Sequence, residues 1–98
     1  MNLGSAIHMC RTRRQLSQTE LARLAGCSVS YLSMLENSKR DPTLSMVKSI
    51  ANGLQVPLEI LFFLGAEKGE LSGIDRELAG QLAMTALDIL NERPAAKA

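Results

Sequence analysis

The chain has 98 residues, of which 46% are hydrophobic and 21% are charged, and its formal net charge is +1. This length predicts one domain with a modest core, and so small a net charge does not identify a partner. Because the sequence has no Trp, one Tyr, two Phe and no alternating apolar pattern, it excludes an aromatic core and a strand-based fold and predicts an all-α protein.

Candidate catalytic and metal-binding side chains are few. Cys10 and Cys27 have only His8 nearby, which is too few ligands for a structural zinc site. There is no pairing of nucleophile and base and no phosphate-binding loop, so we expect no enzyme activity, no metal and no cofactor. With no signal peptide and no apolar stretch long enough to cross a membrane, we expect a cytoplasmic protein with reduced cysteines and no membrane partner.

The first predicted helix runs from Leu3 to Arg14, and the second begins after Ser17, which forms a capping box with Glu20. The stretch from residue 18 to residue 37 then has the pattern of two short helices joined at Gly26, where a sharp reversal favours a residue tolerant of positive φ. The small and apolar positions that would pack this pair are Leu21, Ala22, Leu24, Ala25, Val29, Leu32 and Leu35. This combination is the signature of a helix-turn-helix.

Two more helices complete this part of the chain. Thr43 caps one with an apolar stripe, and Pro57 opens another that is apolar nearly all round. A short helix cannot bury so many apolar residues on one face, so Phe62 or Phe63 is expected to face a partner. Residues 65–73, with three glycines, are predicted to form a linker, and residues 74–93 a last helix.

Residues 18–37 and the segments around them resemble a known protein family. The resemblance rests on LSQTELARLAG, the YLSMLEN that follows, Lys39-Arg40-Asp41-Pro42, and TLSMVKSIANGLQVPLEIL. It covers most of Leu3 to Leu64, and the family that this region resembles is the lambda-repressor-like (Xre/Cro) helix-turn-helix proteins. The resemblance implies a five-helix DNA-binding domain over residues 1–64. The alternative is a helical hairpin that packs a core and touches no nucleic acid.

In the resembling proteins, the third helix enters the major groove and reads base edges. The positions here that would contact bases are Ser28, Val29, Ser30, Ser33 and Met34. None of them is Arg, Gln or Asn, so direct readout by each residue is expected to be weak. Specificity would then depend more on DNA shape, water or other segments.

The resemblance also implies contacts to phosphates, and the side chains expected to make them are Gln18, Tyr31, Asn37, Lys39 and Arg40. Tyr31 is equally well explained as an aromatic side chain that packs across the helix-turn-helix. Arg13 and Arg14 would either reach phosphates or remain solvated. The charge distribution supports a phosphate-binding surface on the helix-turn-helix half of the chain. Residues 1–55 hold seven Lys/Arg against three Asp/Glu, whereas residues 56–98 hold four Lys/Arg against seven Asp/Glu.

Two structural expectations follow from the same resemblance. Arg11 and Glu36 would form a largely buried, bidentate ion pair, and removing one partner would cost about 3–5 kcal/mol. Ser38 stands where the family usually has Gly in a left-handed turn, so some strain or a different loop is expected there.

The last helix is too apolar to stand alone beside a complete domain. It would fold back on its own domain or pair with a second chain, and pairing is the favoured interpretation. The residues expected at an interface between chains are Phe62, Phe63, Ile74, Leu78, Leu82 and Ile89.

Together these features predict a dimeric, sequence-specific transcription regulator, by resemblance a repressor, that binds double-stranded DNA at an inverted repeat with half-sites about 34 Å apart. The alternative is a protein-interaction module, such as an antitoxin-like partner of another protein, that keeps the fold with weak or lost DNA reading.

Overall fold

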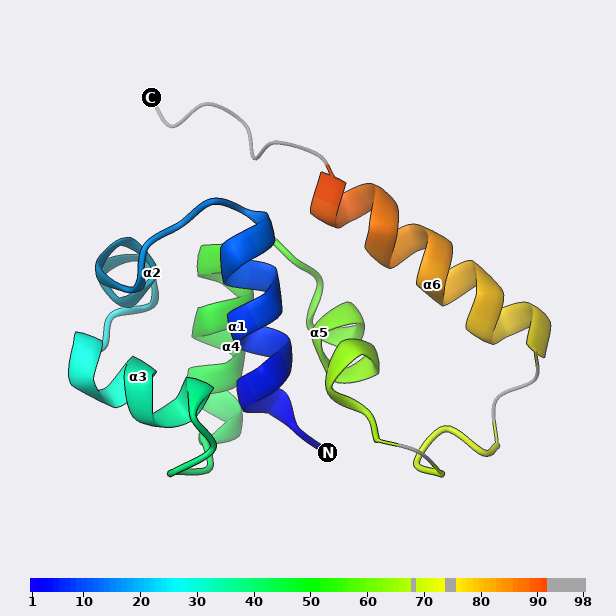
Figure 1. Cartoon of the computed structure of the whole chain (residues 1–98), viewed down its shortest axis with the longest axis horizontal. Helices are drawn as coiled ribbons and strands as arrows, with labels where there is room; N and C mark the ends of the chain where they lie inside the picture. The colour runs from blue at the N-terminus through cyan, green and yellow to red at the C-terminus, as the bar shows by residue number, and fades with distance from the viewer. Residues whose placement is uncertain (68, 74–75, 92–98) are drawn as a thin grey trace.

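The computed structural model describes residues 1–67, 69–73 and 76–91, and the regular secondary structure of this part of the chain is all helical. The helices are α1 (Leu3–Arg13), α2 (Gln18–Ala25), α3 (Val29–Glu36), α4 (Leu44–Leu54), α5 (Leu58–Gly65) and α6 (Arg76–Asn91). The predicted all-α class is therefore confirmed. Helices α1 to α5 form one body, and α6 lies along it at the end opposite α2 and α3 (Figure 1).

Side-chain caps begin three of these helices at the places that the sequence predicts. Ser17, Ser28 and Thr43 each accept a hydrogen bond from the backbone N–H three residues on, which satisfies a donor that the helix start leaves free. The carboxylate of Glu20 accepts from the Ser17 N–H at 2.9 Å and completes the capping box. Gly26 ends α2 with φ of 77°, the left-handed conformation that turns the chain into α3.

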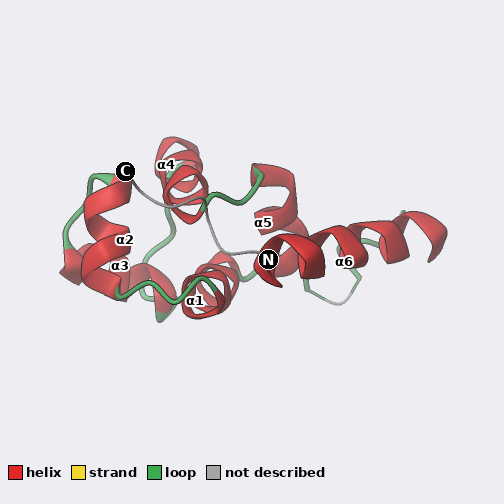
Figure 2. Cartoon of the chain, turned by 90° about the horizontal axis from the view of Figure 1, so that it is seen from above, coloured by secondary structure: helices red, strands yellow, loops and turns green. Residues whose placement is uncertain are grey.

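The core is built from aliphatic side chains and lies among the first five helices. Helix α2 packs on α4, and α1 packs on α5 and α3. Seen from above, α1 and α4 lie on either side of the body, and α6 extends outward past α5 (Figure 2). The largest fully buried side chains are Ile7, Cys10, Leu21, Leu32, Leu35, Ile50, Leu54 and Leu61. Burial of each large aliphatic side chain contributes about 1.5–3 kcal/mol, so this cluster holds the helix-turn-helix in place.

Two glycines allow neighbouring helices to approach closely. A Cβ added at Gly4 in α1 would lie 2.1 Å from the carbonyl oxygen of Leu35 in α3, a contact that no side chain can make. A Cβ added at Gly53 in α4 would meet side-chain carbons of Leu21 at 3.1 Å and Leu24 at 3.2 Å in α2. Gly53 lowers the helix propensity of the last turn of α4, but it leaves room for α2.

The position of Arg14 differs from both sequence interpretations, which placed it in solvent or against phosphates. Its side chain is buried, and the guanidinium donates to the carbonyl oxygens of Leu54 at 2.9 Å and Gln55 at 2.7 Å. These carbonyls end α4 and have no partner within the helix, so they attract a cation. Arg13, in contrast, is exposed.

Helix α6 folds back on its own domain, which was the less favoured of the two interpretations. Ala86 and Leu90 are buried against the body, and Leu82 and Ile89 pack against the same core. We expected Leu82 and Ile89 at an interface between chains, but in this structure they contact their own domain. The physical reason is that α5 and α1 leave an apolar surface uncovered, and α6 supplies its apolar stripe to that surface.

The other residues expected at an interface between chains are placed differently. Phe62 and Phe63 of α5 are half-buried, and Ile74 lies outside the described residues. The large apolar side chains that α6 leaves exposed are Leu78, Met84 and Leu87. An apolar groove of about 270 Å³ runs beside α6, with Met9, Phe63 and Leu87 in its wall.

Helix α5 ends at residue 65, and residues 74, 75, 92 and 93 of the predicted last helix lie outside the described part. No single helix in the described part has the length and apolarity needed to cross a membrane. Only α4 and α5 taken together reach that length and composition, and they are bent by 105° at their junction.

Candidate nucleic-acid interface

One face of α3 is exposed and uncharged. Its inward residues Leu32 and Leu35 are buried, whereas Val29 is 40% and Met34 is 37% exposed. The remaining residues predicted to contact bases are Ser28 and Ser30, which are exposed, and Ser33, which is half-buried. The structure therefore brings these five residues together along one surface. That surface presents three small hydroxyl groups and two apolar side chains.

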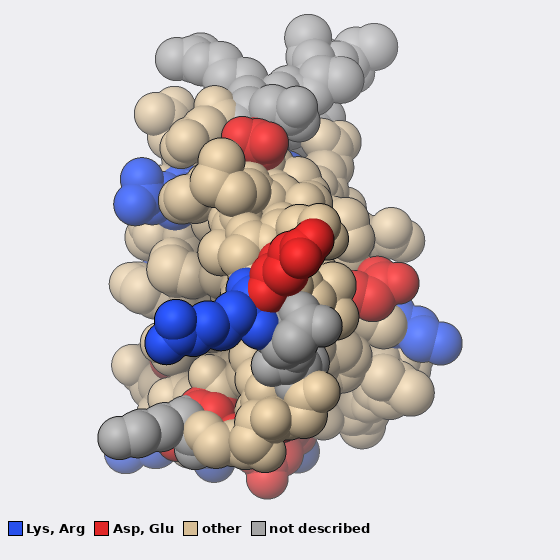
Figure 3. All heavy atoms as spheres, turned by 90° about the vertical axis from the view of Figure 1, so that its right-hand side faces the viewer, with Lys and Arg blue, Asp and Glu red and all other residues tan. Residues whose placement is uncertain are grey.

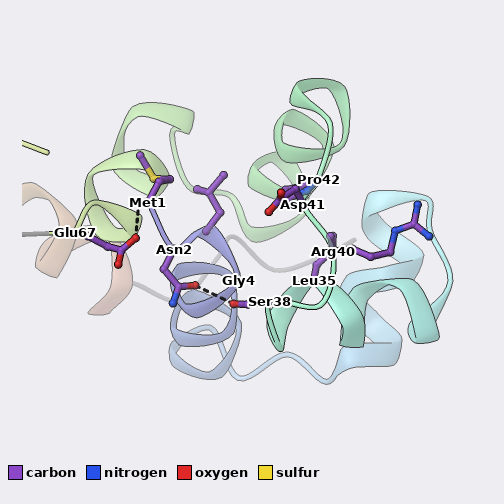
Figure 4. Close-up of a pocket in the computed structure, with 10 residues that line it drawn as sticks. Met1, Asn2, Gly4, Leu35, Ser38, Arg40, Asp41, Pro42 and Glu67 are labelled. Atoms are coloured by element: carbon purple, nitrogen blue, oxygen red, sulfur yellow. Dashed lines mark hydrogen bonds and ion pairs between the residues drawn. The ribbon is translucent and has the colours of Figure 1, made fainter.

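Two basic side chains follow α3 in the loop before α4. Lys39 and Arg40 are both exposed. The guanidinium carbon of Arg40 lies 5.5 Å from the centre of the Tyr31 ring, within the range of a cation–π contact. Arg40 also lines a pocket next to the start of the chain, together with Met1, Asn2 and Pro42, and Figure 4 shows its guanidinium pointing away from the other lining residues. Tyr31 is half-buried and packs against the core, so its ring both packs and supports a cation.

The turn after α3 has a left-handed residue, as the resemblance implies. Ser38 has φ of 58°, and its hydroxyl donates to the side-chain oxygen of Asn2 at 3.2 Å (Figure 4). Asn2 in turn caps α1 through the same oxygen, which accepts from the Ser5 N–H at 3.0 Å. The side-chain amide of Asn37 donates to the Ser33 carbonyl oxygen at 2.9 Å. Asn37 is exposed at the end of α3, next to Lys39.

Arg11 and Glu36 lie in a bidentate contact between α1 and α3. The Nε of Arg11 donates to Oε2 of Glu36 at 2.7 Å, and Nη2 donates to Oε1 at 3.0 Å. The two side chains are 12% and 2% exposed. Nη1 of Arg11 also donates to the Leu16 carbonyl oxygen at 2.9 Å, so the pair fixes α1, α3 and the connection to α2.

Glu36 has two further partners that the sequence did not predict. The side-chain amide of Gln18 donates to Oε1 of Glu36 at 3.1 Å, and Nδ1 of His8 lies 3.1 Å from the same oxygen. Burial alone would raise the pKa of Glu36, but hydrogen bonds from Arg11, Gln18 and His8 outweigh it and lower the pKa. The three-residue spacing of His8 and Arg11, which puts both on one helix face, was the available sequence signal.

The cysteines are placed where they react little. Cys10 is buried, and desolvation raises the pKa of its thiol to about 11. Desolvation also raises the pKa of Cys27, which is half-buried. Protonated thiols are poor nucleophiles and poor metal ligands. Among the described residues, no group of three or more His, Cys, Asp or Glu side chains is arranged to hold a metal ion.

The helix-turn-helix family model matches residues 7–61 of this chain. The matched region begins within α1 and ends within α5, so it contains every side chain of the candidate interface. This is more than half of the chain, and it includes the close contacts at Glu36 as well as the exposed face of α3.

Three relatives are similar over most of the same region. The ImmF control region 10 kDa protein of Bacillus phage phi105 is 34% identical over 74 residues, which are 76% of this chain and 82% of that protein. The immunity repressor protein of the same phage is 33% identical over 61 residues, which are 62% of this chain and 42% of the repressor. An uncharacterized HTH-type transcriptional regulator of Mycobacterium tuberculosis is 36% identical over 59 residues, which are 60% of this chain and 42% of the regulator. The match therefore spans less than half the length of the repressor and the mycobacterial regulator.

Proposed function

Because this chain belongs to the lambda-repressor-like (Xre/Cro) helix-turn-helix family of DNA-binding proteins, we propose that it binds one operator sequence as a dimer and represses transcription there. At the level of the family, the chain is a DNA-binding transcriptional regulator and not an enzyme. What we propose beyond the family is that the chain recognises one operator, that it binds there as a dimer, and that it represses transcription.

The observation that carries the proposal is the exposed face of α3. Leu32, Leu35 and the Arg11–Glu36 pair anchor this helix from behind. In the part of the chain that the structure describes, the outward side chains of Ser28, Val29, Ser30 and Met34 remain exposed. An α-helix presented in this way fits the major groove. Val29 and Met34 would contact thymine methyl groups, and Ser28, Ser30 and Ser33 would form hydrogen bonds to base edges.

Phosphate contacts would come from side chains near the end of α3. Lys39 and Arg40 are exposed beyond the end of α3, with Asn37 beside them, and Gln18 begins α2. Neutralising a phosphate releases bound counterions, so log K is expected to fall with log salt by about 0.9 per contact. These contacts would supply much of the affinity, whereas α3 would supply the selectivity.

For the dimer, we propose contact through the end of the molecule that α6 occupies. Figure 3 looks at this end and shows a face dominated by uncharged residues, with charged side chains near its middle and around its edges. Leu78, Met84 and Leu87 are exposed on α6, and Leu87 also lines the apolar groove. A twofold pair would require an inverted repeat whose half-sites lie about 34 Å, or a multiple of one helical turn, apart.

The test is duplex binding across a salt series, with DNA from upstream of the gene as probe and scrambled DNA as competitor. Protein mass is followed in the same samples. We expect competitor-resistant binding that weakens steeply with salt, at two chains per site. Lys39→Ala should reduce the salt slope by about one, whereas the matched control Arg76→Ala on the exposed start of α6 should leave it unchanged.

Other outcomes would contradict specific parts of the proposal. Binding that scrambled DNA removes equally well would exclude an operator in the probe. One chain per site would exclude the dimer. No binding at low salt by folded protein would favour the protein-interaction module, which the absence of Arg, Lys, Asn and Gln from the base-reading positions of α3 also fits.

A further inference from the structure

The carboxylate of Glu36, on α3, accepts hydrogen bonds from side chains of α1 and α2. It takes two bonds from Arg11 of α1 and one, at 3.1 Å, from the Nε2 of Gln18 at the start of α2. The ring of His8, 58% exposed, lies at the outer side of the same carboxylate. Glu36 itself is the last residue of α3 and is 2% exposed.

We propose that Glu36 is a positioning residue for DNA binding: it orients the side-chain amide of Gln18 for contact with a phosphate. This inference rests on the proposed function, because it concerns a side chain of the same interface. It adds a role for Glu36 beyond its pairing with Arg11.

The two ends of the Gln18 side-chain amide have opposite hydrogen-bonding roles. The NH₂ end of Gln18 only donates and the oxygen end only accepts, whereas a phosphate oxygen accepts. A Gln side chain that rotates freely would therefore present the wrong end to a phosphate about as often as the right one. An ionised carboxylate also only accepts, so it holds the NH₂ end of Gln18 and excludes the flipped amide.

The same nitrogen has a second hydrogen for the phosphate. Within the described residues Nε2 of Gln18 has one acceptor, Glu36, and Gln18 is half-buried at the boundary between the core and the surface. The fixed amide thus keeps one N–H for a further acceptor. Glu36 remains ionised at neutral pH because its partners lower its pKa, so this arrangement persists under ordinary conditions.

Arg11 contributes to this arrangement through its charge. An unpaired carboxylate close to the DNA would repel phosphates, but Arg11 neutralises Glu36 at 2.7 Å. The Glu36 carboxylate can therefore orient a donor for an anion without itself opposing the anion. This combination of orientation and neutrality is what a phosphate contact at Gln18 requires.

The first arm of the test needs no DNA. In ¹⁵N–¹H spectra of the full chain, the side-chain amide of Gln18 is assigned with Gln18→Ala and followed during an acid titration. We expect its resonances to shift as Glu36 gains a proton, with a midpoint below the ordinary carboxylate range. Gln81, exposed on α6, is the control and should not follow the same midpoint. A Gln18 amide that behaves like Gln81 would overturn the proposal.

The second arm is a cycle of DNA affinities for the wild type, Gln18→Ala, Glu36→Gln and the double variant, each checked for folding by circular dichroism. We expect Gln18→Ala to weaken binding roughly tenfold in the wild type, as for loss of a bond to a charged group. In the Glu36→Gln background, the same substitution should cost less than about threefold. An equal factor in both backgrounds would mean that Glu36 is only structural.

The two arms separate the possible failures. If the wild type binds no duplex, the proposed function fails, and the amide titration still decides whether Glu36 holds Gln18. If Glu36→Gln does not fold, Gln18→Met replaces the cycle, because it keeps the side-chain length without an amide. Gln18→Met should then lose binding as much as Gln18→Ala, and wild-type affinity for Gln18→Met would overturn the contact.

Discussion

Arg14 and Leu54 join the end of α1 to the end of α4: the Nε of Arg14 donates to the Leu54 carbonyl oxygen at 2.9 Å. The neighbouring carbonyl of Gln55 accepts from Nη2 of Arg14 at 2.7 Å. Gln55 has φ of 57°, so it ends α4 in a left-handed conformation without being a glycine. The left-handed turn at Gln55 satisfies the carbonyls of Ala51 and Asn52, and Arg14 adds partners for the next two open carbonyls, those of Leu54 and Gln55.

Replacing Arg14 with Met should therefore destabilise the fold without touching the DNA-facing surface. Loss of buried hydrogen bonds from a charged donor costs about 1.5–3 kcal/mol, or roughly 6–24 °C in the melting temperature of a chain this size. Thermal unfolding measures the change. Arg13→Met, at the exposed neighbouring position, is the control and should change little. Equal melting temperatures for the two variants would contradict this role of Arg14.

The stability of the protein should fall in acid through Glu36. The pKa of Glu36 is lower in the folded protein than in the unfolded chain, so the unfolded chain binds the proton more tightly. This stabilisation is complete above the unfolded pKa and is lost as the pH falls through the folded pKa. Urea unfolding at a series of pH values from 7 to 3 gives the free energy of unfolding at each pH. This free energy should fall less steeply with falling pH for Glu36→Gln than for the wild type. An equally steep fall in the two proteins would contradict this role of Glu36.

Adding one methyl group at Gly4 should be strongly destabilising, because the new Cβ would lie 2.1 Å from the Leu35 carbonyl oxygen. Overpacking of this kind typically costs about 1–3 kcal/mol. Gly80→Ala provides the opposite case, since a Cβ at Gly80 of α6 meets nothing within 4 Å. There the substitution should stabilise by about 0.4–1 kcal/mol. Urea denaturation that ranks the two variants in the reverse order would contradict this view of the α1–α3 contact.

Ser38 allows strain and hydrogen bonding to be separated. Ser38→Ala keeps the left-handed φ of 58° and loses the bond to Asn2, so it should be less stable than the wild type. Ser38→Gly loses the same bond but relieves the strain, and it should exceed Ser38→Ala by about 1 kcal/mol. Chemical denaturation of the three proteins gives the order. Equal free energies of unfolding for Ser38→Ala and Ser38→Gly would show that the turn is not strained.

Local signals explain why so much of the fold was predictable. The caps at Ser17, Ser28 and Thr43 and the turn at Gly26 involve residues within a few positions of one another, so their chemistry is visible in the sequence. The resemblance added the left-handed turn at Ser38, and the structure has one there.

The features that were missed depend on contacts between distant segments. Arg14 is buried because the end of α4, forty residues later, happens to present carbonyl oxygens to it. Gln18 and His8 meet Glu36 only after three helices are packed. For α6, the apolar stripe predicted that either its own domain or a second chain would cover it, and in this structure α6 packs against α1 and α5. Periodicity alone does not distinguish these partners.

The direct backbone contact at Gly4 also bears on how α3 would adapt to DNA. Because no side chain separates α1 from α3 there, α3 has no compressible layer on which to tilt. A surface that is already ordered gives up little conformational entropy on binding. We therefore expect the duplex to make the structural adjustments, so that operators would be ranked by how easily their DNA bends or narrows at the groove.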